Sequence, residues 1–270
     1  MKHCFLAIFL FMIISYMHAT DNIRLPDIRC MGMGMCGVSN TSLFNPALVS
    51  RESYKSISIN YFNYYGLKEL GTINAEFSYL NNYISAGANI SSFGYDEYRI
   101  SMFRLFTGKT LNEKWSIGVS LQYTILQTIL VDENPQYLSA DIGLLFSPVE
   151  KLSIGMSIQD FPCVELRKKN VNDIESVIFY SLQIGFEWEV INNMLIVGNV
   201  ETDKNTSISG RVGVEYKLMD NFCVRMGVRT TPLLPTFGIG YKLHSFVIDA
   251  AAQYHPVLGM STGIGVKYCL

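Results

Sequence analysis

The chain has 270 residues, a formal net charge of −2, and charged side chains at only 16% of its positions. In a soluble domain about a quarter of the residues are usually charged, and a nucleic-acid-binding protein is usually basic. This composition therefore argues against both classes. Its 16 Phe, 16 Tyr and 21 Gly, combined with low charge, are typical of a β-barrel with one face in lipid.

The segment 1–19 is predicted to be a cleaved secretory signal peptide. Lys2 and His3 precede an apolar run at 5–14, and the small residue Ala19 follows it. A signal peptide has this order of a basic start, a short apolar run and a small residue at the cleavage site. The alternative is a membrane anchor, which needs roughly 20 apolar residues and is therefore longer than this run. The sequence thus predicts an exported protein.

The segment 20–52 lacks the alternation of polar and apolar residues that marks the rest of the chain. It contains a Gly- and Met-rich run at 31–38 and an Asn-Pro-Ala triplet at 45–47. Such a segment is flexible and apolar, and a large barrel has room for it in its lumen. We therefore expect a short hatch, or plug, at 20–52. Its candidate residues are Gly32, Met33, Gly34, Gly37, Asn45, Pro46 and Ala47.

The remainder, 53–270, is predicted to form β-strands. In 115–125, for example, the odd positions are apolar or aromatic and the even positions are small or polar. Residues i and i+2 share a face of a strand, so each such strand has one apolar and one polar face. The segments with this pattern are 54–65, 71–80, 82–93, 97–107, 113–126, 137–147, 151–160, 178–189, 192–203, 206–217, 221–229, 234–243, 245–254 and 259–269. Lengths of about ten residues suit tilted strands that cross a bilayer.

The connections between these segments alternate in length. Tight polar turns occur at 81–82, 147–150, 192–193, 220–221 and 243–244, and longer connections at 127–136 and 161–177. In outer-membrane barrels the short turns are periplasmic and the long loops extracellular. The predicted fold class is therefore all-β: a transmembrane, antiparallel, up-and-down β-barrel of about 14 strands. It would lie in the bacterial outer membrane, in contact with lipid and lipopolysaccharide, with both termini in the periplasm.

Aromatic residues gather near both ends of the predicted strands. Tyr79 and Trp115 lie near short turns, whereas Tyr61 and Tyr123 lie near longer connections. Two such groups resemble the interfacial girdles of a membrane-spanning barrel. A secreted β-sandwich would also show alternation, but it would not combine two-ended aromatics with alternating loop lengths. The pattern therefore favours the barrel over the sandwich.

The polar face of the strands would line the lumen, and it carries charges of both signs. Opposite charges in similar number are expected to pair across the lumen, which argues against a selectivity filter of one sign. We expect a packed network that stiffens the barrel rather than a conduction path. Its candidate residues are Glu76, Asp141, Glu187, Arg211, Glu215, Arg225, Asp249 and Lys267. Glycines recur on the same face, for example Gly118 and Gly227, and leave room for an inserted segment.

Two parts of the sequence resemble a known family. The run Gly-Met-Gly-Met-Cys-Gly-Val at 32–38, followed by Asn-Pro-Ala before the first strand, is similar to the hatch of FadL-like outer-membrane proteins. With the carboxyl-terminal stretches 238–242 and 258–268, it most resembles the PorV/PorQ branch found in Bacteroidota. This resemblance implies a non-enzymatic accessory of type IX protein secretion or surface-protein handling. The chain departs from the branch at 39–44, which is short and lacks acidic residues, and at its last residue, Leu270, which is not aromatic.

The resemblance leaves two hypotheses open. As a secretion accessory, the barrel would meet secretion-system proteins through the loop 161–177, where Arg167, Lys168 and Lys169 could equally contact lipopolysaccharide. As a FadL-like transporter, it would take hydrophobic small molecules across the outer membrane and release them sideways. Sideways release needs a strand kink at an inward Gly or Pro. We expect Pro232 and Pro235 in a loop, so the sequence predicts no clear opening.

An outer-membrane enzyme is the third class. It would need a His paired with a nucleophile such as Ser near the lipid interface. The mature chain has only His244, in a predicted tight turn, and His255, beside Pro256. Neither stands in such an arrangement, and the five mature cysteines have no metal-site spacing. We therefore expect no enzyme, no metal, no cofactor and no nucleic-acid partner.

Overall fold

The computed structural model describes residues 27–80, 85–129, 134–167, 180–203 and 208–270. The predicted signal peptide, the beginning of the predicted hatch, Lys168 and Lys169 lie outside the described residues. One short helix, α2 (Ile28–Gly32), and two 3-10 turns, η1 (Pro46–Arg51) and η2 (Lys68–Leu70), accompany the strands. No helix in the described part of the chain is both long and apolar enough to span a membrane.

The described residues form fifteen strands. They are β1 (Ser56–Asn63), β2 (Gly71–Leu80), β3 (Ser85–Tyr95), β4 (Tyr98–Thr110), β5 (Trp115–Thr128), β6 (Gln136–Val149), β7 (Leu152–Gln159), β8 (Cys163–Arg167), β9 (Ser181–Ile191), β10 (Met194–Asp203), β11 (Ser209–Met219), β12 (Phe222–Arg229), β13 (Leu234–Leu243), β14 (Phe246–His255) and β15 (Gly259–Cys269). Each of the fourteen segments predicted from alternation overlaps one of them.

The sheet closes into a barrel of fourteen antiparallel strands. Apart from β8, neighbours in sequence pair with one another; β7 pairs with β9, and β1 pairs with β15 along eight register positions, Ser56–Asn63. The predicted fold class is therefore confirmed. Closure gives every strand of the ring two neighbours, which satisfies the backbone hydrogen bonds without a free edge.

Strand β8 is the element that the sequence did not predict. We expected 161–177 to be a loop, but Cys163–Arg167 pair with Gln136–Ser139 at the beginning of β6. At five residues, β8 is too short for alternation to be recognised. The placement of both prolines in a loop is also wrong in part, because Pro235 is the second residue of β13. A proline is tolerated there, close to the end of a strand.

The two faces of the strands differ as alternation requires. On β5 the outward residues Val119 and Leu121 are each 52% exposed, whereas Ser116 and Ser120 are buried. At the short-turn end, the outward rings of Trp115 and Phe146 stack with their centroids 4.3 Å apart. The apolar side chains therefore lie on the outside of the barrel and the polar ones on the inside.

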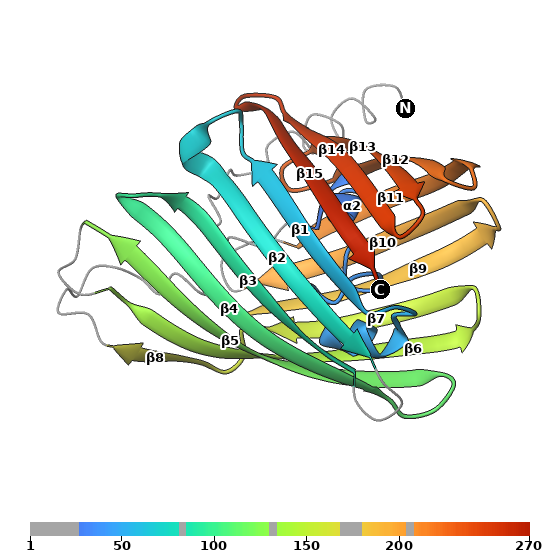
Figure 1. Ribbon diagram of the computed structural model, residues 1–270, viewed down its shortest axis with the longest axis horizontal. Helices are drawn as coiled ribbons and strands as arrows, with labels where there is room; N and C mark the ends of the chain where they lie inside the picture. Colours follow the sequence, from blue (N-terminus) through green and yellow to red (C-terminus); the bar gives the residue numbers. More distant parts are fainter. Residues whose placement is uncertain (1–26, 81–84, 130–133, 168–179, 204–207) are drawn as a thin grey trace, which may run out of the picture.

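The N-terminal segment lies within the ring of strands. In Figure 1 it runs, in blue, between the front strands β1–β5 and the rear strands β9–β12. Helix α2 contacts β12, β13, β14 and β15, whereas η1 contacts β2 to β6 on the other side of the lumen. The segment thus spans the lumen from one wall to the other.

A charge placed on the outward face tests whether that face meets lipid. Leu121→Arg, in the middle of β5, should lower the free energy of unfolding in lipid vesicles by about 2–4 kcal/mol, because it puts a charge in hydrocarbon. Urea titration followed by tryptophan fluorescence measures this change. Leu111→Arg is the matched control, since Leu111 is exposed in the turn before β5 and should lose at most about 1 kcal/mol. Equal small losses would contradict a lipid-facing β5.

Candidate functional site

The described N-terminal segment, residues 27–52, is called the hatch below. Asp27 organises it: one carboxylate oxygen accepts a hydrogen bond from the Cys30 amide at 3.0 Å and so caps α2. The other oxygen accepts from the hydroxyl of Thr41 at 2.9 Å. A single side chain therefore ties the beginning of the hatch to its middle.

Asn45 performs a similar task at the other end of the hatch. Its amide nitrogen donates to the carbonyl of Val38 at 2.8 Å and to the carbonyl of Leu144, on β6, at 3.0 Å. Its side-chain oxygen accepts from the Ala47 amide at 3.1 Å and caps η1. Pro46 follows as the first residue of η1, where a missing amide hydrogen costs nothing. The Asn-Pro-Ala motif thus fixes both the shape of the hatch and its contact with the wall.

Glycines on the inner face allow the hatch backbone to touch the wall directly. A Cβ atom added at Gly118 would collide with the backbone of Pro46 and Ala47, and one at Gly227 with Met33 and Gly34. The other wall glycines where an added Cβ would crowd the hatch are Gly108, Gly143, Gly155, Gly185, Gly213, Gly238 and Gly263. We call these nine residues the glycine belt. No side chain larger than that of glycine fits between the hatch and the wall at these positions.

The glycines of the hatch itself have distinct tasks. Gly34 has a φ of +72°, which favours glycine, and its amide donates to the Thr236 hydroxyl at 2.9 Å. That hydroxyl donates to the carbonyl of Gly32 at 3.2 Å. Gly37 lies against the ring of Phe44, where a Cβ atom would collide with the ring. Met33, between the first two glycines, is fully buried and packs with Cys36 and Val197.

Long polar side chains of the wall hold the carbonyl groups of the hatch. Arg104 donates to the carbonyl of Leu43 at 2.5 Å and Arg211 to that of Met35 at 3.0 Å. Gln159 donates to the carbonyl of Phe44 at 3.0 Å. These three residues lie in turns, outside any helix or strand, so the wall supplies the donors that a regular backbone would otherwise provide to their carbonyl oxygens.

The predicted lumen charges fall into separate groups instead of one network. Asp141 pairs with Arg104 at 2.8 Å and Arg211 pairs with Glu201. The third group joins Arg225 to Glu215 at 2.7 Å and to Asp249 at 2.5 Å, and Glu215 also pairs with Arg29 of the hatch at 3.0 Å. Buried charges of this kind are tolerable because each has a partner of opposite sign.

Three partners in these pairs were missed from the sequence: Arg29, Arg104 and Glu201. Arg104 and Glu201 occupy inward positions of predicted strands, so alternation alone could have found them. Of the remaining predicted residues, Glu76 accepts a hydrogen bond from Ser42 at 2.9 Å. Glu187 and Lys267 line cavities, described next.

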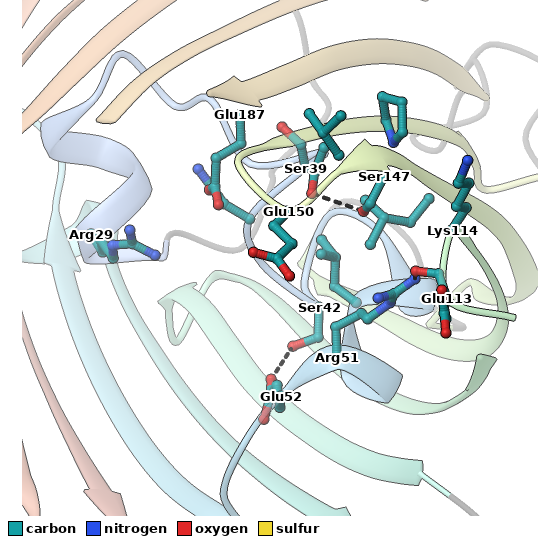
Figure 2. Close-up of a pocket in the computed structure, with 16 residues that line it drawn as sticks. Arg29, Ser39, Ser42, Arg51, Glu52, Glu113, Lys114, Ser147, Glu150 and Glu187 are labelled. Atoms are coloured by element: carbon teal, nitrogen blue, oxygen red, sulfur yellow. Dashed lines mark hydrogen bonds between the residues drawn. The ribbon is translucent and has the colours of Figure 1, made fainter. Parts of the chain in front are cut away.

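Two polar cavities flank the hatch at the short-turn end. Figure 2 shows the first, of about 560 Å³, where Arg29, Arg51 and Glu52 of the hatch face Glu187 and the turn residue Glu150. The second, of about 420 Å³, lies on the opposite side of the hatch against β1, β2 and β13–β15. Both share Arg29, Asn40, Ser42, Arg51 and Glu52 in their lining. The hatch therefore divides a polar vestibule at this end of the barrel.

At the long-loop end, the lumen is apolar on the side of β3–β5. Leu43 and Phe44 of the hatch pack against four buried inward residues: Phe93 of β3, Ile100 and Met102 of β4, and Leu126 of β5. Ile28 and Met31 pack with Phe62 and Ala251 in a second cluster. We call the first of these the apolar cluster. On the side of β3–β5 the inner surface thus changes from polar to apolar along the barrel axis.

The described cysteines are all free thiols. Cys30 and Cys36 are both buried in the hatch. Burial raises the pKa of the Cys36 thiol to about 12, so this thiol stays protonated and unreactive while the hatch is seated. Among the described residues, no group of three or more His, Cys, Asp or Glu side chains is placed to hold a metal ion.

Comparison with known proteins identifies the architecture. No protein-family model and no curated protein matches this sequence. A FadL homologue from Pseudomonas aeruginosa, 12% identical, superposes with a TM-score of 0.61 over 91% of this chain and 99% of its own. The toluene transporter TodX from Pseudomonas putida, 10% identical, superposes with a TM-score of 0.62 over 93% and 98%. The fold is that of the FadL-like outer-membrane barrels. The narrower resemblance to the PorV/PorQ branch is not confirmed by these matches.

A methyl group on the glycine belt tests how closely the hatch sits. Gly227→Ala should lower the free energy of unfolding by about 1–3 kcal/mol, the usual cost of overpacking. It should also expose Cys36 to maleimide, detected by mass spectrometry of the digested protein. Gly210→Ala is the control, because an added Cβ there meets only ordinary contacts, at 3.5 Å or more, with Thr230. Labelling of Cys36 that is equally slow in both variants would contradict a hatch seated on Gly227.

Proposed function

We propose that this chain is an outer-membrane barrel through which small apolar molecules cross, with the segment 20–52 as its hatch. The observation that carries this proposal is the apolar cluster on the inner face at the long-loop end. The inner face of a water-filled barrel is polar, and here Phe93, Ile100 and Met102 point inward and are at most 7% exposed. An apolar solute that enters there leaves water for an apolar surface, which is favourable.

The structural neighbours support the same class of solute. TodX is described as a toluene transporter and also as a monoaromatic hydrocarbon channel. At 10% identity, TodX shows only that this chain has the same fold. The proposal that this chain carries a similar solute is based on the apolar cluster. A general diffusion porin fits less well, because the glycine belt, the arginine side chains and the hatch leave the lumen filled.

A route out of the lumen is supported by the break between β7 and β8. The β7–β9 ladder has eight register pairs and ends at Gln159 and Ser181, whereas the β4–β5 ladder has thirteen. Beyond the break, β8 pairs with β6, and Asp160 has a φ of +56°. Ser139 donates to the Asp160 carboxylate at 2.7 Å, and Asp160 donates its own amide to Asp141 at 2.8 Å. We infer that solute leaves the lumen beside this fixed break.

The proposal includes an orientation. The short turns and both chain ends would face the periplasm, the long connections would face outward, and residues 1–19 would direct export before cleavage. On this orientation the apolar cluster meets solute from outside, and the polar vestibule opens toward the periplasm. Lipid and lipopolysaccharide would surround the barrel, and neither an enzymatic activity nor a cofactor is part of the proposal.

A secretion accessory of the PorV/PorQ type is the second candidate. It rests on the resemblance of the hatch motif, whose residues Gly32, Gly34, Asn45, Pro46 and Ala47 all contact the wall, as they also would in a FadL-like transporter. Such a barrel would act through protein partners at its surface. Tagged barrel recovered from native membranes would then bring down secretion-system proteins, which solute transport does not require.

Solute uptake tests the main proposal. Cells that produce the barrel should take up radiolabelled toluene faster than cells without it. Leu126→Asn, which places an amide in the apolar cluster, should reduce this uptake by about tenfold, because an unpaired polar group in apolar surroundings costs on the order of 1–3 kcal/mol. Leu121→Asn is the matched control on the outward face of the same strand.

Two outcomes would contradict the proposal. Uptake that is the same with and without the barrel would remove the transport function. An equal loss in Leu126→Asn and Leu121→Asn, with equal amounts of folded barrel, would remove the role of the apolar cluster. Planar-bilayer conductance provides an independent check: the intact barrel should conduct little, and deletion of residues 20–52 should open a large aqueous pore.

A further inference from the structure

Ser42 of the hatch stands between two carboxyl groups at the short-turn end. Its hydroxyl lies 2.9 Å from an oxygen of Glu76, on the inward face of β2, and 3.4 Å from an oxygen of Glu52, which follows η1. This is the contact through which the middle of the hatch reaches β2. The second oxygens of Glu52 and Glu76 are buried and have no hydrogen-bond partner among the described residues.

The number of hydrogens on the Ser42 hydroxyl limits how many carboxylates it can bind. A serine hydroxyl has one hydrogen to donate and two lone pairs to accept with. Ser42 can therefore donate to only one of the two carboxylates. The other contact is a hydrogen bond only if that carboxyl is protonated and donates to the Ser42 oxygen. The hydroxyl of Ser78 is a second donor near Glu52, but two ionised carboxylates would still place two like charges side by side in a partly buried site, which is costly.

The charged groups around Glu52 and Glu76 are consistent with one bound proton shared by the two carboxyl groups. Those that line the same cavity are Asp27, Arg29 and Arg51 of the hatch, Lys242 of β13, Asp249 of β14 and Lys267 of β15. Asp27 caps α2, and Arg29 and Asp249 belong to the ion-paired group of Glu215 and Arg225. Arg51 bonds Ser116 and the carbonyl of Glu113.

Lys267 is the cation whose charge acts on both carboxyl groups of the pair. A pair that holds one proton carries a single negative charge, which Lys267 balances. A pair without the proton would carry two.

We propose that Glu52 and Glu76 share one proton through Ser42, and that this proton holds the hatch against β2. Raising the pH removes the proton and loosens the hatch. The inference concerns the seating of the hatch and does not depend on which molecule the barrel carries, because its test involves no solute.

The direction of the effect follows from proton linkage. Burial raises the pKa of the Glu52 carboxyl, although Lys267 opposes this shift. A released hatch would expose Glu52 to water, where a glutamate has a pKa of about 4.3. The seated hatch thus binds more protons than the released one. Seating is strongest at low pH, weakens as the pH rises from about 4.3, and stops changing above the raised pKa.

Hydrogen exchange of the intact barrel in detergent micelles tests the effect on the hatch. Exchange of peptides that cover 39–51, corrected for the intrinsic effect of pH, should speed up by about tenfold per pH unit in this window. In Glu76→Gln and in Glu52→Gln, the corrected exchange should depend less on pH, because the remaining carboxyl meets no second carboxylate and can accept the Ser42 hydrogen while ionised. Glu113→Gln is the control: this exposed carboxyl lines the first cavity, outside the pair, and should leave the pH dependence unchanged.

Infrared spectroscopy tests the proton itself. The wild-type barrel should show a C=O stretching band of a protonated carboxyl that disappears within the same pH window. Each single Glu→Gln variant should lack this band, and Glu113→Gln should keep it. Circular dichroism establishes that each variant is folded, and two pair variants are used in case one fails to fold. A band that persists in a folded pair variant, or hatch exchange with the wild-type pH dependence in such a variant, would overturn the proposal.

Discussion

The contact between the hatch backbone and the glycine belt is the constraint on which the rest of the lumen depends. Because the wall has no side chains at Gly118, Gly143 or Gly227, the hatch lies within van der Waals distance of the strands. Its carbonyl groups then come within reach of Arg104, Arg211 and Gln159. The arginines in turn are buried, so they require Asp141 and Glu201 as partners. The absence of side chains along the glycine belt therefore accounts for both the hydrogen bonds from the wall to the hatch and the buried ion pairs.

The same condition separates the two ends of the lumen. The hatch leaves polar cavities at the short-turn end and closes against apolar side chains at the long-loop end. A molecule that moves along the axis beside β3–β5 would exchange an apolar environment for a charged one. The hatch stands at this boundary, and for this reason its seating matters more to the proposed function than the size of the barrel.

The strands could be predicted from the sequence because a half-buried strand repeats every two residues, whatever it packs against. Alternation placed all fourteen strands of the ring and the inward side of each. It could not show β8, which is too short, or the break at Asp160, which depends on hydrogen bonds to Ser139 and Asp141 from another strand. The prolines were a poor guide, since Pro235 lies inside β13.

The lumen was harder to predict for a similar reason. Alternation assigns a charge to the inner face, but it does not say which charges meet across the barrel. Glu215 pairs with Arg225 on the neighbouring strand and with Arg29, a hatch residue 186 positions away in the sequence. Ser42 and Glu76 meet in the same way. Contacts between the hatch and the wall depend on where the hatch lies, which no periodicity encodes.

The glycine belt also determines what the inside of the barrel would look like without its hatch. Over much of its circumference the wall would present bare strand backbone, with polar donors from Arg104, Arg211 and Gln159 aimed at absent carbonyl groups. This part of the wall is therefore complementary to a polypeptide main chain and its carbonyl groups. A molecule that displaces the hatch along this wall would leave those donors satisfied only if it carried hydrogen-bond acceptors in similar places.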